Sequence, residues 1–273
     1  MAETSTDDAA RLPALIADLQ AEHDALDAVI APLADEQWSL DTPSPGWNVA
    51  DQIAHLTYFD DTAMTAIEDA DRFHETNATL LQGVVSGELD MDEATLAWRR
   101  ELAPAELLVR WRGNRRRLLD AARTLSPADR VAWYGPSMGA LSFLTARLME
   151  TWAHGQDVVD AVGGERAATD RLRHIAQLGV ITRNWTYRNR GLDDPEGDVR
   201  VELAAPSGDT WRWNEDGDAG AISGSAEDFC LVVTQRRHVD DTALSVTGAA
   251  ARDWMEKAQA FAGGATDGPA PRP

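Results

Sequence analysis

The sequence predicts a mainly helical protein, in which an antiparallel four-helix bundle is followed by a small C-terminal α+β domain. Long amphipathic segments with apolar residues at spacings of three and four fill the first two thirds of the chain. After Gly191 the pattern changes to short alternating stretches separated by glycine-rich segments, which is typical of strands. Apolar residues make up 44% of the 273 residues, enough for a large hydrophobic core.

The four bundle helices each have a sequence signal for their start or end. The loop 41–46, with two prolines and a glycine, ends the first helix. Asn48 is a good N-cap for the second, with Asp51 three residues later. Pro104 suits the first turn of the third, and Gly163 ends the fourth. The predicted helices are 12–33, 48–67, 105–125 and 140–162.

The remainder of the chain predicts a smaller domain. A fifth helix is expected at 167–188, and a closing helix at 249–261. Short strands are expected at 199–203, 210–213, 231–233 and 244–246. We place the domain boundary near residue 190, which gives a bundle over 1–190, an α+β domain over 191–262 and a disordered tail over 263–273.

Charge and composition exclude several classes of protein. The formal net charge of −21 repels phosphate backbones and anionic lipid, so we expect neither nucleic-acid nor membrane binding. Cys230 is the only cysteine, which excludes an internal disulfide and a cysteine-based zinc cluster. The first ten residues are acidic and polar, unlike a secretory signal. These features predict a cytoplasmic protein, either a monomer or a homodimer.

The fourth predicted helix carries two chemically reactive side chains. Glu150 and His154 lie four residues apart, on one face of a helix that is apolar around most of its circumference. A buried carboxylate and imidazole need partners. They can pair with each other, or they can chelate one divalent metal together with a ligand from a facing helix. His55, beside the apolar stripe of the second helix, is the candidate for that third ligand.

Two segments resemble a known family of metal-binding bundles. Residues 45–56 (PGWNVADQIAHL) and 150–157 (ETWAHGQD) look like the two halves of the DinB-like signature. More narrowly, they are similar to the mycothiol-dependent maleylpyruvate isomerase family, which also carries a small α+β domain after its bundle. The resemblance implies that His55, Glu150 and His154 bind a divalent metal, usually zinc.

The residues themselves also suit this chemistry. Two imidazoles and one carboxylate match zinc, and three protein ligands leave one coordination position open for catalysis. Nickel, manganese or iron would also fit. No cysteine lies near the motif, so a nucleophilic thiol would come from a cosubstrate, which the resemblance implies is mycothiol. Its thiolate would add to a small electrophilic metabolite, and the enzyme would act as an isomerase if the thiol leaves again or as an S-transferase if it stays.

Other functions of the same residues remain open. The site also suits a thiol-independent hydrolase, dehydratase or cyclase of secondary metabolism, or a metal-binding protein without catalytic activity. The resemblance implies that Arg236 or Arg237 holds a substrate carboxylate; the alternative is that they form surface ion pairs with Asp240 and Asp241. Asp157 would orient a metal ligand, or else face solvent. We expect His23 to belong to the core of the first helix.

Overall fold

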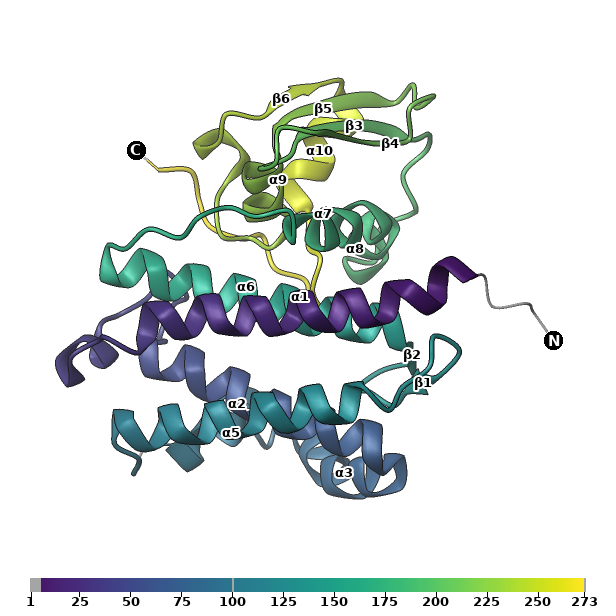
Figure 1. Ribbon diagram of the computed structural model, residues 1–273. Coiled ribbons are helices and arrows are strands. Elements are labelled where there is room, and N and C mark those ends of the chain that lie inside the picture. Colours follow the sequence, from purple (N-terminus) through teal and green to yellow (C-terminus); the bar gives the residue numbers. More distant parts are fainter. Residues whose placement is uncertain (1–5, 100, 273) are drawn as a thin grey trace. The chain divides into compact units, whose positions relative to one another are not determined.

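The computed structural model describes residues 6–99 and 101–272, and the chain forms two compact units, Met1–Arg166 and Ala167–Pro273. The first unit is a helical bundle and the second is a small sheet with its own helices (Figure 1). The predicted fold class is therefore confirmed. Within the described ranges, no helix is both long and apolar enough to cross a membrane.

Four long helices build the bundle of the first unit. They are α1 (Thr6–Ile30), α2 (Val49–Glu68), α5 (Pro104–Ala122) and α6 (Ala140–Val162). Shorter elements connect them: η1 (Asp35–Ser39), α3 (Ala70–Ser86), α4 (Met91–Leu96), η2 (Ala97–Arg99), β1 (Arg130–Val131) and β2 (Met138–Gly139). The first helix thus begins and ends earlier than the predicted range of 12–33.

Hydrogen bonds reveal the directions of the bundle helices. The side chain of Asn114 on α5 donates to the carbonyl of Thr57 on α2, and Arg117 pairs with Asp61 one turn further along both helices. α2 and α5 therefore run in the same direction (Figure 1). Between them, α3 and α4 return the chain to the end of the bundle at which α2 begins. The antiparallel pairs of the bundle are α1 with α5 and α2 with α6.

The start of α2 is fixed as the sequence predicts. The Asn48 side chain accepts from the backbone N–H of Asp51 at 3.0 Å, and the Asp51 carboxylate accepts from the backbone N–H of Asn48 at 3.0 Å. This reciprocal capping box satisfies two N–H groups that a helix start leaves without partners. Which side chains of α2 enter the bundle is decided by burial of its apolar face, to which Ile53 and Leu56 belong.

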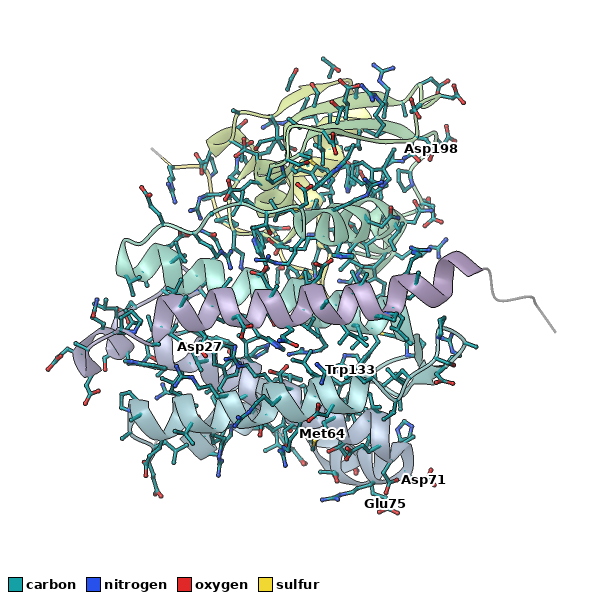
Figure 2. All side chains as sticks on the ribbon, viewed as in Figure 1. Asp27, Met64, Asp71, Glu75, Trp133 and Asp198 are labelled. Atoms are coloured by element: carbon teal, nitrogen blue, oxygen red, sulfur yellow. The ribbon has the colours of Figure 1, made fainter. Side chains whose placement is uncertain are left out.

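Apolar packing and a polar seam hold the helices together. Ile53 and Leu56 of α2 pack with Trp111 of α5 in one fully buried cluster. At the edge of this core, Asp27 of α1 binds two arginines of α5, at 2.5 Å for Arg112 Nη2 and also through Arg115 (Figure 2). Most stabilisation comes from the apolar contacts, since partly exposed ion pairs contribute little.

A four-stranded sheet forms the centre of the second unit. Its strands are β3 (Val199–Ala204), β4 (Thr210–Trp213), β5 (Gly220–Ser225) and β6 (Ser245–Thr247), in the order β4-β3-β5-β6. β3 and β5 are parallel, and the other two pairs are antiparallel. The helical elements of the unit are α7 (Leu172–Ile181), α8 (Arg183–Asn189), α9 (Ala226–Val233), η3 (Val239–Asp241) and α10 (Ala249–Lys257).

For two segments of this unit the predicted secondary structure is wrong. The run 231–233, expected as a strand, is the last turn of α9, and the glycine-rich segment before it contains the strand β5. β5 needs its glycines: a Cβ on Gly220 would lie 2.6 Å from the carbonyl oxygen of Thr247. The predicted fifth helix is divided near Thr182 into α7 and α8.

The division into units also differs from the predicted boundary near residue 190. It falls at Arg166, because α7 packs against α9 and so belongs with the sheet. The predicted disordered tail contains no helix or strand in its described part, but it does make hydrogen bonds. The Thr266 hydroxyl donates to the Gln235 side chain at 2.6 Å, and the backbone N–H of Arg272 donates to Asp241 at 3.0 Å.

Candidate metal centre

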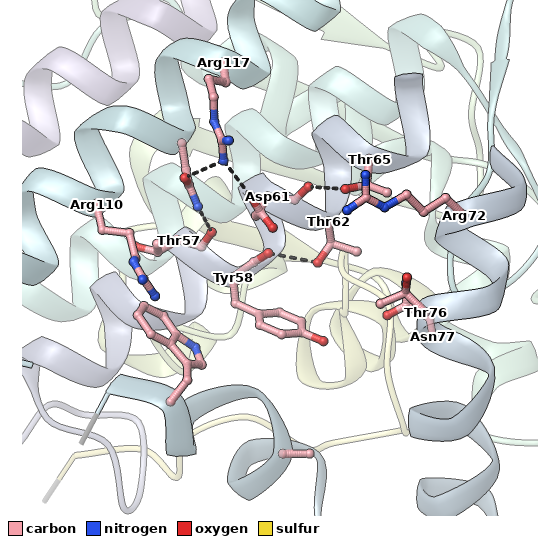
Figure 3. A pocket seen from close by; sticks show the side chains of 13 residues that line it. Thr57, Tyr58, Asp61, Thr62, Thr65, Arg72, Thr76, Asn77, Arg110 and Arg117 are labelled. Atoms are coloured by element: carbon pink, nitrogen blue, oxygen red, sulfur yellow. Dashed lines mark hydrogen bonds and ion pairs between the residues drawn. The ribbon is translucent and has the colours of Figure 1, made fainter. Parts of the chain in front are cut away.

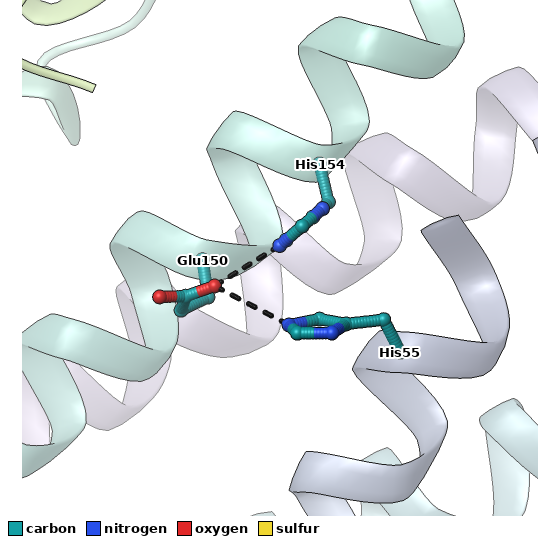
Figure 4. A group of neighbouring side chains, drawn as sticks. All are labelled: His55, Glu150 and His154. Carbon is teal, nitrogen blue, oxygen red and sulfur yellow. Dashed lines mark hydrogen bonds and ion pairs between the residues drawn. The ribbon is translucent and has the colours of Figure 1, made fainter. Parts of the chain in front are cut away.

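Three predicted ligands meet between α2 and α6 (Figure 4). His154 Nε2 lies 3.1 Å from Glu150 Oε2, and His55 Nε2 lies 3.7 Å from the same oxygen. One donor atom from each residue falls within 4.8 Å of the others. The four-residue spacing on α6 places Glu150 and His154 on one face, and packing of the apolar face of α2 brings His55 opposite them.

His154 is oriented by Gln52, a residue to which the sequence analysis assigned no role. The Nδ1 atom of His154 lies 2.6 Å from the amide oxygen of Gln52. Since an amide oxygen can only accept, Nδ1 is the ring nitrogen that donates to Gln52, and Nε2 is the ring nitrogen that faces Glu150. Gln52 is held in turn by its amide nitrogen, which donates to the Thr42 hydroxyl at 2.8 Å.

Aromatic rings cover the imidazoles. Trp47 stacks on His154 with 14° between the ring planes and 5.8 Å between the centroids, and it contacts His55 at 5.1 Å. Its indole N–H donates to Asp92 Oδ2 at 2.8 Å. Phe59 packs on His55 at 4.6 Å. The site is thereby shielded but not closed, because the Glu150 side chain is still 23% exposed.

The site holds its donors in forms that bind cations. Burial and the neighbouring His154 lower the pKa of His55 from 6.5 to about 4, which leaves a neutral imidazole near pH 7. Burial acts to raise the pKa of Glu150, but its interactions with His154 and His55 outweigh burial and hold this pKa well below its ordinary value. Metal ligands must be deprotonated, so the Glu150 carboxylate and the neutral His55 imidazole fit a divalent ion.

Other predicted site residues have different environments. Asp157 is buried, at 2% exposure, and accepts from the Ser44 hydroxyl at 3.1 Å, so it does not face solvent. A role for Asp157 in orienting a metal ligand stays a prediction. His23 is fully buried beside Trp111, as predicted for a core residue.

Arg236 and Arg237 belong to the second unit. They follow α9, and each donates to a nearby backbone carbonyl: Arg236 to Thr234 at 2.7 Å, and Arg237 to Arg236 at 2.7 Å. The neighbouring Asp240 pairs with Arg252 at 2.7 Å. Binding of a substrate carboxylate by these arginines stays a prediction.

The fold and this site define a helical bundle with an inward-facing cluster of two histidines and one glutamate. The sequence matches the family model of the mycothiol maleylpyruvate isomerase N-terminal domain over residues 19–159. The chain belongs to this family, which confirms the resemblance seen in the sequence.

Similar proteins extend over most of the chain. The uncharacterized proteins MT0041 and Rv0036c, from two strains of Mycobacterium tuberculosis, are each 46% identical over 248 residues, which is 91% of this chain and 95% of theirs. Two crystal structures of the mycothiol-dependent maleylpyruvate isomerase, one of a point mutant, superpose with a TM-score of 0.56. They cover 86% of this chain and 92% of their own, at 20% and 19% identity, so they support the fold.

Proposed function

We propose that the protein is a metal-dependent enzyme that uses mycothiol to isomerise a small electrophilic metabolite. The observation that carries the proposal is the convergence of His55, Glu150 and His154 on one point, with His55 neutral and Glu150 ionised near pH 7. Membership of the mycothiol maleylpyruvate isomerase family supports the thiol. Zinc is the metal that this ligand set suits best.

The residues around the cluster have distinct tasks in this proposal. His55, Glu150 and His154 would hold the ion, and a divalent cation there would lower the pKa of a bound thiol. Gln52 keeps the proton of His154 on Nδ1, so that Nε2 stays available. Trp47 excludes water from one side of the imidazoles, which strengthens electrostatic interactions at the site.

The chain itself does not offer a suitable thiol. Cys230 is its only cysteine, and it is fully buried in the second unit. Burial raises the pKa of this thiol well above its ordinary value, and the thiol contacts the Leu172 carbonyl at 3.5 Å. A neutral, enclosed thiol is a poor nucleophile. The nucleophile would therefore come from a cosubstrate.

The fate of the thiol decides between two reactions. In an isomerase the thiolate adds to a cis double bond of the substrate, the intermediate rotates about the resulting single bond, and elimination restores the thiol and the double bond. In an S-transferase the carbon–sulfur bond persists. Arg236 or Arg237 would hold a substrate carboxylate in either reaction.

The test is turnover of maleylpyruvate by the zinc-loaded protein with and without mycothiol. We expect conversion to the trans isomer only when mycothiol is present, with no net thiol consumption. Stoichiometric thiol loss with a new thioether would identify an S-transferase. Conversion that is unaffected by thiol would favour a hydrolase, dehydratase or cyclase, and a tightly bound metal without turnover of thiol-reactive electrophiles would favour a non-catalytic role.

A further inference from the structure

A recess in the first unit is lined by none of the three candidate ligands. It has a volume of about 570 Å³ and is formed by α2, α3, α5 and the segment around Trp98 (Figure 3). That volume is in the usual range for small-molecule sites.

The buried part of the recess is polar. Thr57, Thr62 and Asn77 line it and are 9% exposed or less. The Thr57 and Thr62 hydroxyls donate to carbonyls of their own helix, at 2.6 and 2.9 Å, which leaves oxygen lone pairs free to accept. The Tyr58 side chain also lines the recess (Figure 3). An apolar ligand would gain little from such walls.

The mouth of the recess is positively charged in a strongly acidic protein. Arg72, Arg110 and Arg117 line it together with one carboxylate, Asp61, although the net charge of the chain is −21. Arg117 is paired with Asp61 at 2.6 Å. Among the described residues, neither Arg72 nor Arg110 has a carboxylate partner. The Arg110 side chain is nevertheless held in place by Trp98, since its guanidinium packs 5.0 Å from the centre of that ring.

We propose that this recess binds a small polar oxyanion, a carboxylate or a phosphate ester, through Arg72 and Arg110. Guanidinium groups bind either oxyanion with paired hydrogen bonds. The hydroxyl oxygens of the interior would accept hydrogen bonds from the remaining part of the ligand. This site is separate from the candidate metal centre and does not depend on the proposed isomerase activity.

The experiment is isothermal titration of the purified full-length protein with succinate, with inorganic phosphate and with the neutral analogue succinamide. We expect saturable binding of succinate, phosphate or both, and no binding of succinamide. In the double variant Arg72→Gln/Arg110→Gln the Kd should rise about tenfold or more, since a hydrogen bond between charged groups is lost at each site. Both side chains are exposed, so the variant should fold normally.

Two control variants test whether the anions bind in this recess. Arg116→Gln removes the same charge from α5 without touching the recess, and His154→Ala alters the candidate metal centre; both should bind the anions as the wild type does. Stronger binding of phosphate than of succinate would identify phosphate esters as the ligand class, and the reverse would identify carboxylates. Absence of anion binding, unchanged binding in the double variant, or loss of binding in His154→Ala would overturn the proposal.

Discussion

Arg147 of α6 and Asp60 of α2 form an ion pair inside the bundle, with 2.9 Å between Nη2 and Oδ1 and side-chain exposures of 4% and 1%. Arg147 lies one helical turn before Glu150, and Asp60 follows His55 on α2. The ion pair therefore joins the same two helices that supply the candidate ligands. Burial raises the pKa of Asp60, although Arg147 acts to lower it, which indicates that desolvation of this carboxylate is costly.

Breaking this ion pair should destabilise the bundle strongly. Arg147→Met leaves the Asp60 carboxylate buried without its partner, so we expect the free energy of unfolding to fall by about 3–5 kcal/mol. The double variant Asp60→Leu/Arg147→Met removes both charges and should recover most of that loss. Urea denaturation measures both. A double variant less stable than the single one would show that the charges stabilise the fold by themselves.

His154→Ala should abolish metal binding while the helices persist. The bundle is held by apolar packing around Trp111 and Ile53, which this substitution leaves untouched. We expect about one zinc per chain in the wild type and almost none in the variant, as measured by elemental analysis, with unchanged far-ultraviolet circular dichroism. His74→Ala, at an exposed position on α3, is the matched control and should keep its metal. Full metal content in His154→Ala would exclude it as a ligand.

Gln52→Ala should weaken metal binding without removing a ligand. The substitution frees His154 to change its tautomer or rotate, and loss of such an orienting group typically costs 10–100-fold in metal affinity. Gln52→Glu keeps an accepting oxygen and should restore most of the affinity. Competition with a chromophoric chelator measures the dissociation constants. Gln82→Ala, at an exposed position of α3, should leave the metal affinity unchanged. Equal metal affinities for the wild type and all three variants would show that Gln52 does not position His154.

His23 should make stability fall in mild acid. Burial, assisted by Arg115 and Arg147, lowers the pKa of His23 from 6.5 to about 3. Between these pH values the unfolded chain binds a proton that the folded chain does not, so stability decreases as the pH falls from 6.5 towards 3. The slope is at most about 1.4 kcal/mol per pH unit.

The measurement for His23 is chemical denaturation of wild type and His23→Leu between pH 7 and pH 4. The variant lacks this titration, so its stability should fall less steeply with acid than that of the wild type. Both ring nitrogens of His23 lack hydrogen-bond partners in the described structure, so leucine removes no polar contact there. Parallel pH profiles for the two proteins would contradict the lowered pKa.

Cys230→Ala should leave mycothiol-dependent turnover unchanged. The thiol is enclosed in the second unit, and its raised pKa keeps it protonated at neutral pH. Steady-state kinetics with and without mycothiol would check this, after circular dichroism has confirmed the fold. Activity that disappears with Cys230 would mean that the chain supplies its own nucleophile.

Sequence periodicity was sufficient for the bundle and for two of the three candidate ligands. Glu150 and His154 share a helix, so their spacing alone places them together. Its position beside the apolar stripe made His55 a candidate, but only the resemblance implied that it joins the other two, because its meeting with α6 depends on tertiary packing. Gln52 was missed for the same reason: an amide next to an apolar stripe carries no local signal, and its role appears only when α2 lies against α6.

The smaller unit was harder to predict because its strands and helices are short. A three-residue apolar run such as 231–233 fits either a strand or the end of a helix. In the folded protein it is the end of the helix α9. β5 contains glycines that normally indicate a loop. They are required there by close approach of neighbouring atoms, a condition that the sequence does not reveal.

The candidate ligands have a further consequence for the order of events during synthesis of the chain. His55 is made early, whereas Glu150 and His154 are nearly a hundred residues later, so no local segment holds a complete ligand set. Bringing such distant residues together carries a large loop-closure entropy, which the apolar packing of the bundle must offset. A metal ion would therefore bind to a bundle that has already folded and would not nucleate it, in contrast to small zinc domains whose folding requires the metal.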